Sequence, residues 1–159
     1  PTAIMGPGGR LMAWAGHPWA AWDTPEGDQE SIVTLLRRVA ALRRGAGRDF
    51  LVFGRLLRPL PVQEIEQVTW SCDGQIHTMA AVLHAHWEAA DGRTALALAN
   101  WTADERVVHL DAIPAHDGPT RYHLQCDTLD MGDLDRGQAH PARLTLPPLG
   151  VALVEWGKA

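Results

Sequence analysis

The sequence has 159 residues, of which 46% are hydrophobic and 21% are charged, and its formal net charge is −5. This length suffices for one domain with a hydrophobic core, and this composition excludes wholesale disorder. No apolar run approaches the ~20 residues that cross a bilayer, and no basic stripe lies in the second half. We therefore expect neither a membrane span nor nucleic-acid binding.

Residues 1–27 are rich in Gly, Pro, Ala and Trp and follow neither a helical nor a strand period. Trp14, Trp19 and Trp22 lie close together, next to Asp23. Such a segment can hardly fold alone, so we expect its indoles to pack on the rest of the chain or on a neighbouring domain. The alternative is a saccharide platform, because flat aromatic faces stack on sugar rings. These four residues are the candidate carbohydrate-binding residues.

Residues 28–44 are predicted to form a helix. Asp28 suits its N-cap, and Glu30 falls in the first turn, where the helix dipole favours a carboxylate. Apolar residues recur at three- and four-residue spacing, namely Ile32, Leu35, Leu36, Val39, Ala40 and Leu42. Arginines gather at the C-terminal end, and Gly45 and Gly47 predict a left-handed stop. The sequence therefore predicts one amphipathic helix.

The segment after the helix combines a short apolar run with an extended, proline-punctuated connector that ends at Pro61. We interpret it as a joint between residues 1–61 and residues 62–159. The chain begins at Pro1 without an initiator methionine. We expect it to be part of a longer polypeptide, and a processed native start is the alternative.

From residue 62 onward the apolar period becomes two. Alternating runs cover residues 81–87, 95–99, 107–110, 121–126, 144–146 and 151–156. Turn signals separate them, and Asp91-Gly92 is the strongest hairpin signal. Each run should turn one face to a core and the other to water or a neighbour. The pattern predicts a mainly β fold, an antiparallel β-sandwich of about seven to eight strands preceded by the helix. Residues 127–141 have few apolar residues and should form an exposed loop.

Cys72 and Cys126 match no metal-binding spacing and are too few for a disulfide framework. We favour two buried thiols, with a single bridge between them as the alternative. The cellular compartment therefore stays open.

The acidic residues fall mostly in turns, so turn formation and solubility explain them, and we expect no catalytic pair. Asp23 and Glu30 are the least implausible candidates because they adjoin the Trp residues. His84 and His86 share one strand face, and a metal site would follow if His109 and His123 lay on neighbouring strands. Histidines on sheet surfaces are common, so we expect no metal and no cofactor.

Two strand-like runs and the turn between them form a sequence motif: residues 81–88, an Asp-Gly turn, and residues 95–102, which end in Asn100-Trp101-Thr102. This motif resembles one found in the C-terminal β-sandwich domains of bacterial TIM-barrel glycoside hydrolases related to α-galactosidases. Residues 144–156 resemble the final hairpin of these domains. Residues from the helix to Pro59 resemble the last barrel helix and its exit.

The resemblance implies that residues 1–61 are a remnant or edge of a catalytic barrel. It also implies that the chain is a non-catalytic ancillary domain of a carbohydrate-active enzyme, whose catalytic carboxylates lie on earlier strands. The expected partners are the catalytic barrel of the same polypeptide and an oligo- or polysaccharide. A stand-alone carbohydrate-binding module that uses exposed Trp residues is the alternative, and a small hydrolase is a less favoured one.

Overall fold

The structure is a computed structural model that describes residues 4–5, 11–13, 26–63, 65–72, 75–111, 113–114, 120–126, 129–133 and 143–157. Its elements are β1 (Ile4–Met5), β2 (Leu11–Ala13), α1 (Glu26–Arg44), α2 (Arg48–Leu51), β3 (Arg55–Leu56), β4 (Gln67–Cys72), β5 (Gln75–Ala80), β6 (Val82–Glu88), β7 (Thr94–Asn100), β8 (Arg106–His109), β9 (Thr120–Gln125), β10 (Leu129–Asp133), β11 (Arg143–Leu146) and β12 (Val151–Trp156). The predicted mainly β fold is confirmed.

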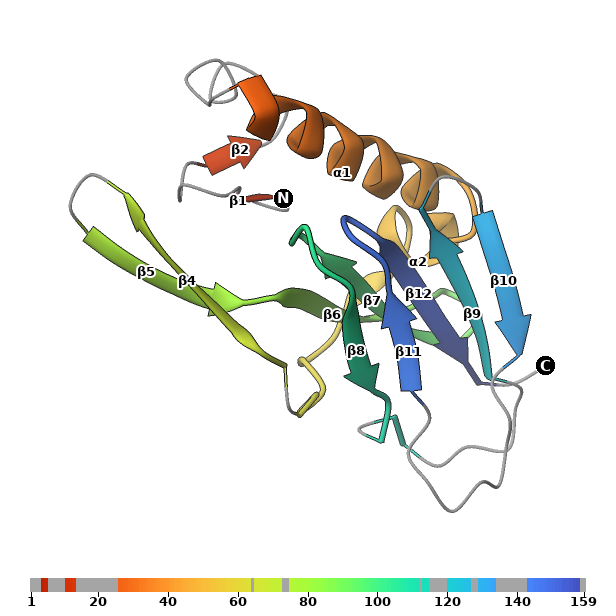
Figure 1. Ribbon diagram of the computed structural model, residues 1–159. Coiled ribbons are helices and arrows are strands. Elements are labelled where there is room, and N and C mark those ends of the chain that lie inside the picture. Colours follow the sequence, from red (N-terminus) through yellow and green to blue (C-terminus); the bar gives the residue numbers. More distant parts are fainter. Residues whose placement is uncertain are drawn as a thin grey trace.

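Two antiparallel sheets face each other across the main core (Figure 1). The larger has the strand order β10-β9-β12-β7-β6-β3, and the smaller pairs β8 with β11. Buried side chains fill the space between them, including Leu96 and Leu98 of β7 and Leu144 and Leu146 of β11. The arrangement is a β-sandwich, as the two-residue period predicts.

Helix α1 covers the other face of the large sheet (Figure 1), with Leu35 and Leu42 buried against it. Small residues on this face of β7, such as Ala95, let the helix approach closely. Strands β7 and β12 are therefore covered on both faces. Of the two environments that the sequence pattern left open for the second face, water or a neighbour, the structure shows a neighbour, which is α1. The apolar face of α1 belongs to the domain's own core, because the sheet lies beneath it.

The ends of α1 differ from the prediction. The helix begins at Glu26, so Asp28 falls inside its first turn and is not the N-cap. The expected left-handed stop is also wrong, since Gly47 has φ −81° and Gly45 has no positive φ either. Close approach explains Gly47, because a Cβ there would lie 2.9 Å from the Leu42 carbonyl oxygen and 2.9 Å from Leu51 Cδ1.

Three further segments differ from the sequence prediction. Residues 1–27 include the antiparallel pair β1–β2, although they show no strand period. The apolar run after α1 forms the short helix α2, and the connector supplies β3 to the sheet edge. The predicted loop 127–141 contains β10, which pairs with β9. An edge strand needs backbone pairing on one side only, so a weak apolar pattern suffices.

The Asp91-Gly92 hairpin is confirmed. Strands β6 and β7 pair up to Glu88 and Thr94, and Ala89 and Arg93 close the loop with a backbone bond of 2.8 Å. Gly92 donates to the Ala89 carbonyl at 3.0 Å and has φ +84°. This left-handed conformation favours glycine at that position.

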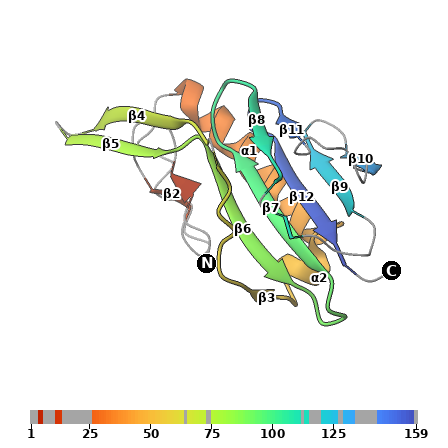
Figure 2. The same cartoon turned by 90° about the horizontal axis from the view of Figure 1, so that it is seen from below.

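The β4–β5 hairpin extends away from the sandwich in both views (Figures 1 and 2). Its predicted turn, Asp73-Gly74, lies outside the described residues. In the described part of the chain, neither helix has the length and apolar character needed to cross a bilayer.

Candidate functional site

The sequence-predicted carbohydrate-binding residues, Trp14, Trp19, Trp22 and Asp23, all lie outside the described residues. Their role therefore stays a prediction. The same holds for the state of the two cysteines, because the side chain of Cys72 is likewise outside the described part. Cys126 is half-buried directly after β9.

The histidines of β6 have structural partners. His84 and His86 do share one strand face, and their rings contact the backbone of the connector. His84 Nε2 lies 3.2 Å from the Leu60 carbonyl oxygen, and His86 Nδ1 lies 3.2 Å from that of Arg58. The His86 ring also stacks on Trp156 at a centroid distance of 5.6 Å. These two histidines thus hold the connector against strand β6.

His109 and His123 do not lie on neighbouring strands, which was the condition for a histidine metal site. His109 lies on β8, which pairs with β11, whereas His123 lies on β9, between β10 and β12. Among the described residues, no group of three or more His, Cys, Asp or Glu side chains is placed to hold a metal ion.

Arg93, which follows the β6–β7 turn, binds three carboxylates. Its guanidinium donates to Asp91 at 2.7 Å, to Asp49 at 2.8 Å and to Glu155 at 3.0 Å. Its Cζ lies 5.2 Å from the centroid of the Phe50 ring, a cation–π contact. The cluster ties the hairpin loop to α2 and to β12.

Two of these carboxylates, Asp91 and Glu155, have a lowered pKa. Backbone and side-chain hydrogen bonds from Arg93 lower the pKa of Asp91. The pKa of Glu155 is lowered chiefly by the hydrogen bond from His123, whose Nε2 lies 3.2 Å from Oε1, and burial opposes this effect. A general acid in glycoside hydrolysis needs a raised pKa. Asp91 and Glu155 are therefore poorly suited to that role.

Lowering the pH is expected to remove the contribution of Glu155 to stability. Because its pKa is lowered on folding, this contribution is complete above about 4.5, the ordinary glutamate value, and disappears as the pH falls through the folded value. Glu155→Gln should lower the free energy of unfolding by about 1.5 kcal/mol near neutral pH. It should also make the stability of the protein depend less on pH in the acid range. Thermal unfolding of both proteins from neutral to acid pH checks this, and parallel curves would contradict it.

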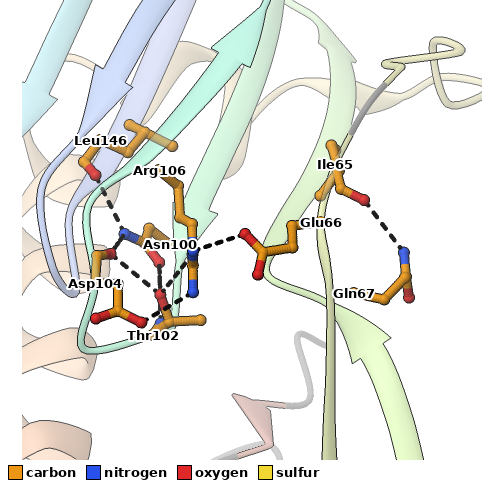
Figure 3. Close-up of polar contacts among 8 residues, drawn as sticks. All are labelled: Ile65, Glu66, Gln67, Asn100, Thr102, Asp104, Arg106 and Leu146. Atoms are coloured by element: carbon orange, nitrogen blue, oxygen red, sulfur yellow. Dashed lines mark hydrogen bonds and ion pairs between the residues drawn. The ribbon is translucent and has the colours of Figure 1, made fainter.

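A second polar cluster surrounds the Asn100-Trp101-Thr102 motif (Figure 3). The buried Asn100 amide donates to the carbonyls of Asp104 at 2.7 Å, Pro147 at 2.9 Å and Leu146 at 3.2 Å. Its Oδ1 accepts from the backbone N–H of Thr102 at 3.0 Å and from the Thr102 hydroxyl at 2.7 Å. One side chain thus joins the β7–β8 turn to the β11–β12 turn.

Arg106 extends this cluster to the segment before β4 (Figure 3). It donates to the Thr102 hydroxyl at 3.2 Å, to Asp104 at 3.1 Å and to Glu66 at 2.7 Å. The indole of Trp101 donates to the Ala80 carbonyl at 2.6 Å, and its ring packs on Leu35 of α1. The Asn100-Trp101-Thr102 motif is therefore structural, because its polar groups hold the β7–β8 and β11–β12 turns together.

A mostly apolar cavity of about 270 Å³ lies between α1 and the β6–β7 part of the sheet. Leu35, Val39 and Leu42 line it from the helix, and Leu83 and Trp87 line it from β6. The indole nitrogen of Trp87 is buried without a hydrogen-bond partner. Such a lining suits apolar groups, and Arg43 and His84 add two polar side chains to it.

The chain was compared with known proteins. Curated proteins give no significant match. Solved structures align weakly: the bifunctional glucanase-xylanase CelM2 from a metagenome library has 15% identity, a TM-score of 0.39, and 53% of this chain and 18% of that chain covered. A GH30 endoxylanase from Clostridium papyrosolvens has 7% identity and a TM-score of 0.39, with 51% and 22% covered.

A GH51 arabinofuranosidase from Xanthomonas axonopodis pv. citri has 15% identity and a TM-score of 0.34, with 56% of this chain and 21% of that chain covered. This chain thus spans about a fifth of the length of these glycoside hydrolases. Residues 80–154 match a family model described as D-apionate lactonase, C-terminal immunoglobulin-like domain. The match runs from the end of β5 into β12, so the sandwich is similar to that C-terminal domain.

Proposed function

We propose that the chain is the non-catalytic C-terminal accessory domain of a hydrolase that acts on carbohydrates or on lactones derived from them. The observation that carries this proposal is the match of residues 80–154 to the C-terminal immunoglobulin-like domain of D-apionate lactonase. It favours a lactone as the parent enzyme's substrate over the glycoside that the sequence motif suggested.

The polar groups of the sandwich support a mechanical role. Three arginines bind six carboxylates between them, namely Arg55 with Glu88, Arg93 with Asp49, Asp91 and Glu155, and Arg106 with Glu66 and Asp104. Carboxylates held this way fix turns and strands. In the proposed enzyme, the reacting groups belong to a preceding catalytic barrel, and this domain covers and stabilises one side of it.

The test compares the complete polypeptide encoded by the gene with the chain of residues 1–159. Both are assayed with the lactone of D-apionate, followed by proton release, and with a panel of aryl glycosides. We expect the complete polypeptide to open the lactone and the isolated chain to match the buffer rate. Lactone or glycoside hydrolysis by the isolated chain would overturn the proposal, and polysaccharide binding by it would favour a binding module.

A further inference from the structure

Positive charge is concentrated in one stretch of this acidic chain. Residues 33–58 contain seven arginines and a single acid, Asp49, a net charge of +6 in a chain of net charge −5. Asp49 is already bound by Arg93. Five of the arginines are exposed and form no ion pair with a carboxylate in the described part of the chain: Arg37, Arg43, Arg44, Arg48 and Arg58.

Exposed apolar side chains accompany these arginines. In the described residues, four of the six exposed large hydrophobic side chains fall in the same stretch, namely Val33, Val52, Phe53 and Leu56. Phe53 is 63% exposed, and the Arg48 guanidinium lies 5.3 Å from its ring centroid. Arginine and aromatic residues are enriched in protein interfaces, and gathered apolar groups mark interaction sites.

The shape of the surface also suits a partner. An open hollow of about 310 Å³ is lined by Phe53, Arg55, Glu88 and residues of the β6–β7 loop. Strand β3, which follows Phe53, is the outermost strand of the large sheet and has only two residues (Figure 2). A projecting ring, a hollow and a sheet edge therefore lie together at one corner of the domain.

We propose that this arginine-rich surface, formed by Arg44, Arg48, Phe53, Leu56 and Arg58, docks on an acidic face of the catalytic domain of the same polypeptide. The inference rests on the proposed function and adds the docking surface and the charge of its partner. The exposed arginines offer positive charge to carboxylates of the partner, and the exposed ring of Phe53 offers it an apolar contact.

The residue types favour a protein over a nucleic acid as the partner. The basic residues of this stretch are all arginine, and the single lysine of the chain is Lys158. Arginine is preferred for interface ion pairs because its planar fork binds carboxylates through two hydrogen bonds. The exposed aliphatic side chains Val52 and Leu56 gain nothing from a phosphate backbone, whereas a protein surface can bury them.

Hydrogen exchange measured peptide by peptide tests the inference. In the complete polypeptide, peptides covering residues 44–58 should exchange at least about tenfold more slowly than in the isolated chain, which corresponds to about 1.4 kcal/mol of added protection. Arg48→Glu should abolish this difference. Arg143→Glu, an exposed charge reversal on β11, is the matched control and should leave it unchanged. Raising salt from about 0.1 M to about 1 M should weaken the protection.

The outcomes separate the two proposals. A complete polypeptide that hydrolyses the lactone but exchanges over residues 44–58 like the isolated chain overturns the docking surface alone. A complete polypeptide without hydrolase activity or without a preceding domain overturns the proposed function, and the docking surface with it. Binding of a short labelled DNA duplex by the isolated chain, lost in Arg48→Glu, would also overturn an acidic protein partner.

Discussion

Replacing Asn100 by Asp is expected to lower the free energy of unfolding by about 3–5 kcal/mol, the loss typical of an uncompensated buried charge. The side chain is 0% exposed, and its amide faces the carbonyl oxygens of Asp104, Leu146 and Pro147. A carboxylate of the same shape would place a negative charge against these acceptors and would remove every donor. Both turns that Asn100 joins should then loosen.

Urea unfolding at neutral pH measures this loss, and Thr102→Val is the control. That variant removes the hydroxyl bonded to Asn100 at 2.7 Å but leaves the amide intact, so it should cost about 1 kcal/mol. The deficit of Asn100→Asp relative to the unmodified protein should shrink in acid, because a protonated carboxyl can donate again. Equal losses in the two variants, or a deficit independent of pH, would contradict the assigned role of the amide.

Local chemistry made part of this fold predictable. Asp91-Gly92 predicted its hairpin because the turn needs a left-handed residue, and Gly92 has φ +84°. The three- and four-residue spacing of Leu35 and Leu42 predicted α1, and these side chains are indeed buried. The two-residue period predicted the sandwich for the same reason, since strand side chains alternate between faces.

Long-range pairing explains what the sequence could not predict. Ala95 looks like a small surface residue of an alternating strand, yet it is buried because α1 returns over that face. Whether His109 and His123 lie on neighbouring strands could not be read from the sequence, because strand order follows from tertiary packing, which separates them into two sheets. Strand β10 forms despite a weak apolar pattern, because the pairing of an edge strand depends on its backbone.

The arginine-rich stretch and the Arg93 cluster also differ in how far the sequence predicts them. The excess of arginine over residues 33–58 is visible in the sequence alone, so a count of charge along the chain could have pointed to the proposed docking surface. The contacts of Arg93 could not be found that way. Its carboxylate partners Asp49 and Glu155 lie 44 and 62 positions away, and only the fold brings them together.

The two phenylalanines of the chain provide the second large expected effect. Phe50→Ala should cost about 3–5 kcal/mol, because the ring is 0% exposed, packs with Leu42 and Leu153, and lies under Arg93. Phe53→Ala, three positions away, should change the stability of the isolated chain by less than about 0.5 kcal/mol because its ring is exposed.

The same pair links stability to docking. In the complete polypeptide, Phe53→Ala should cost more than in the isolated chain, because truncating an interface anchor typically costs about 2 kcal/mol or more. Phe50→Ala should cost the same in both, since its ring serves only the core. Chemical denaturation of both variants in both proteins checks this. A Phe53 loss that is equal in the two proteins would place Phe53 outside any interface, and a small Phe50 loss would contradict the packing beneath α1.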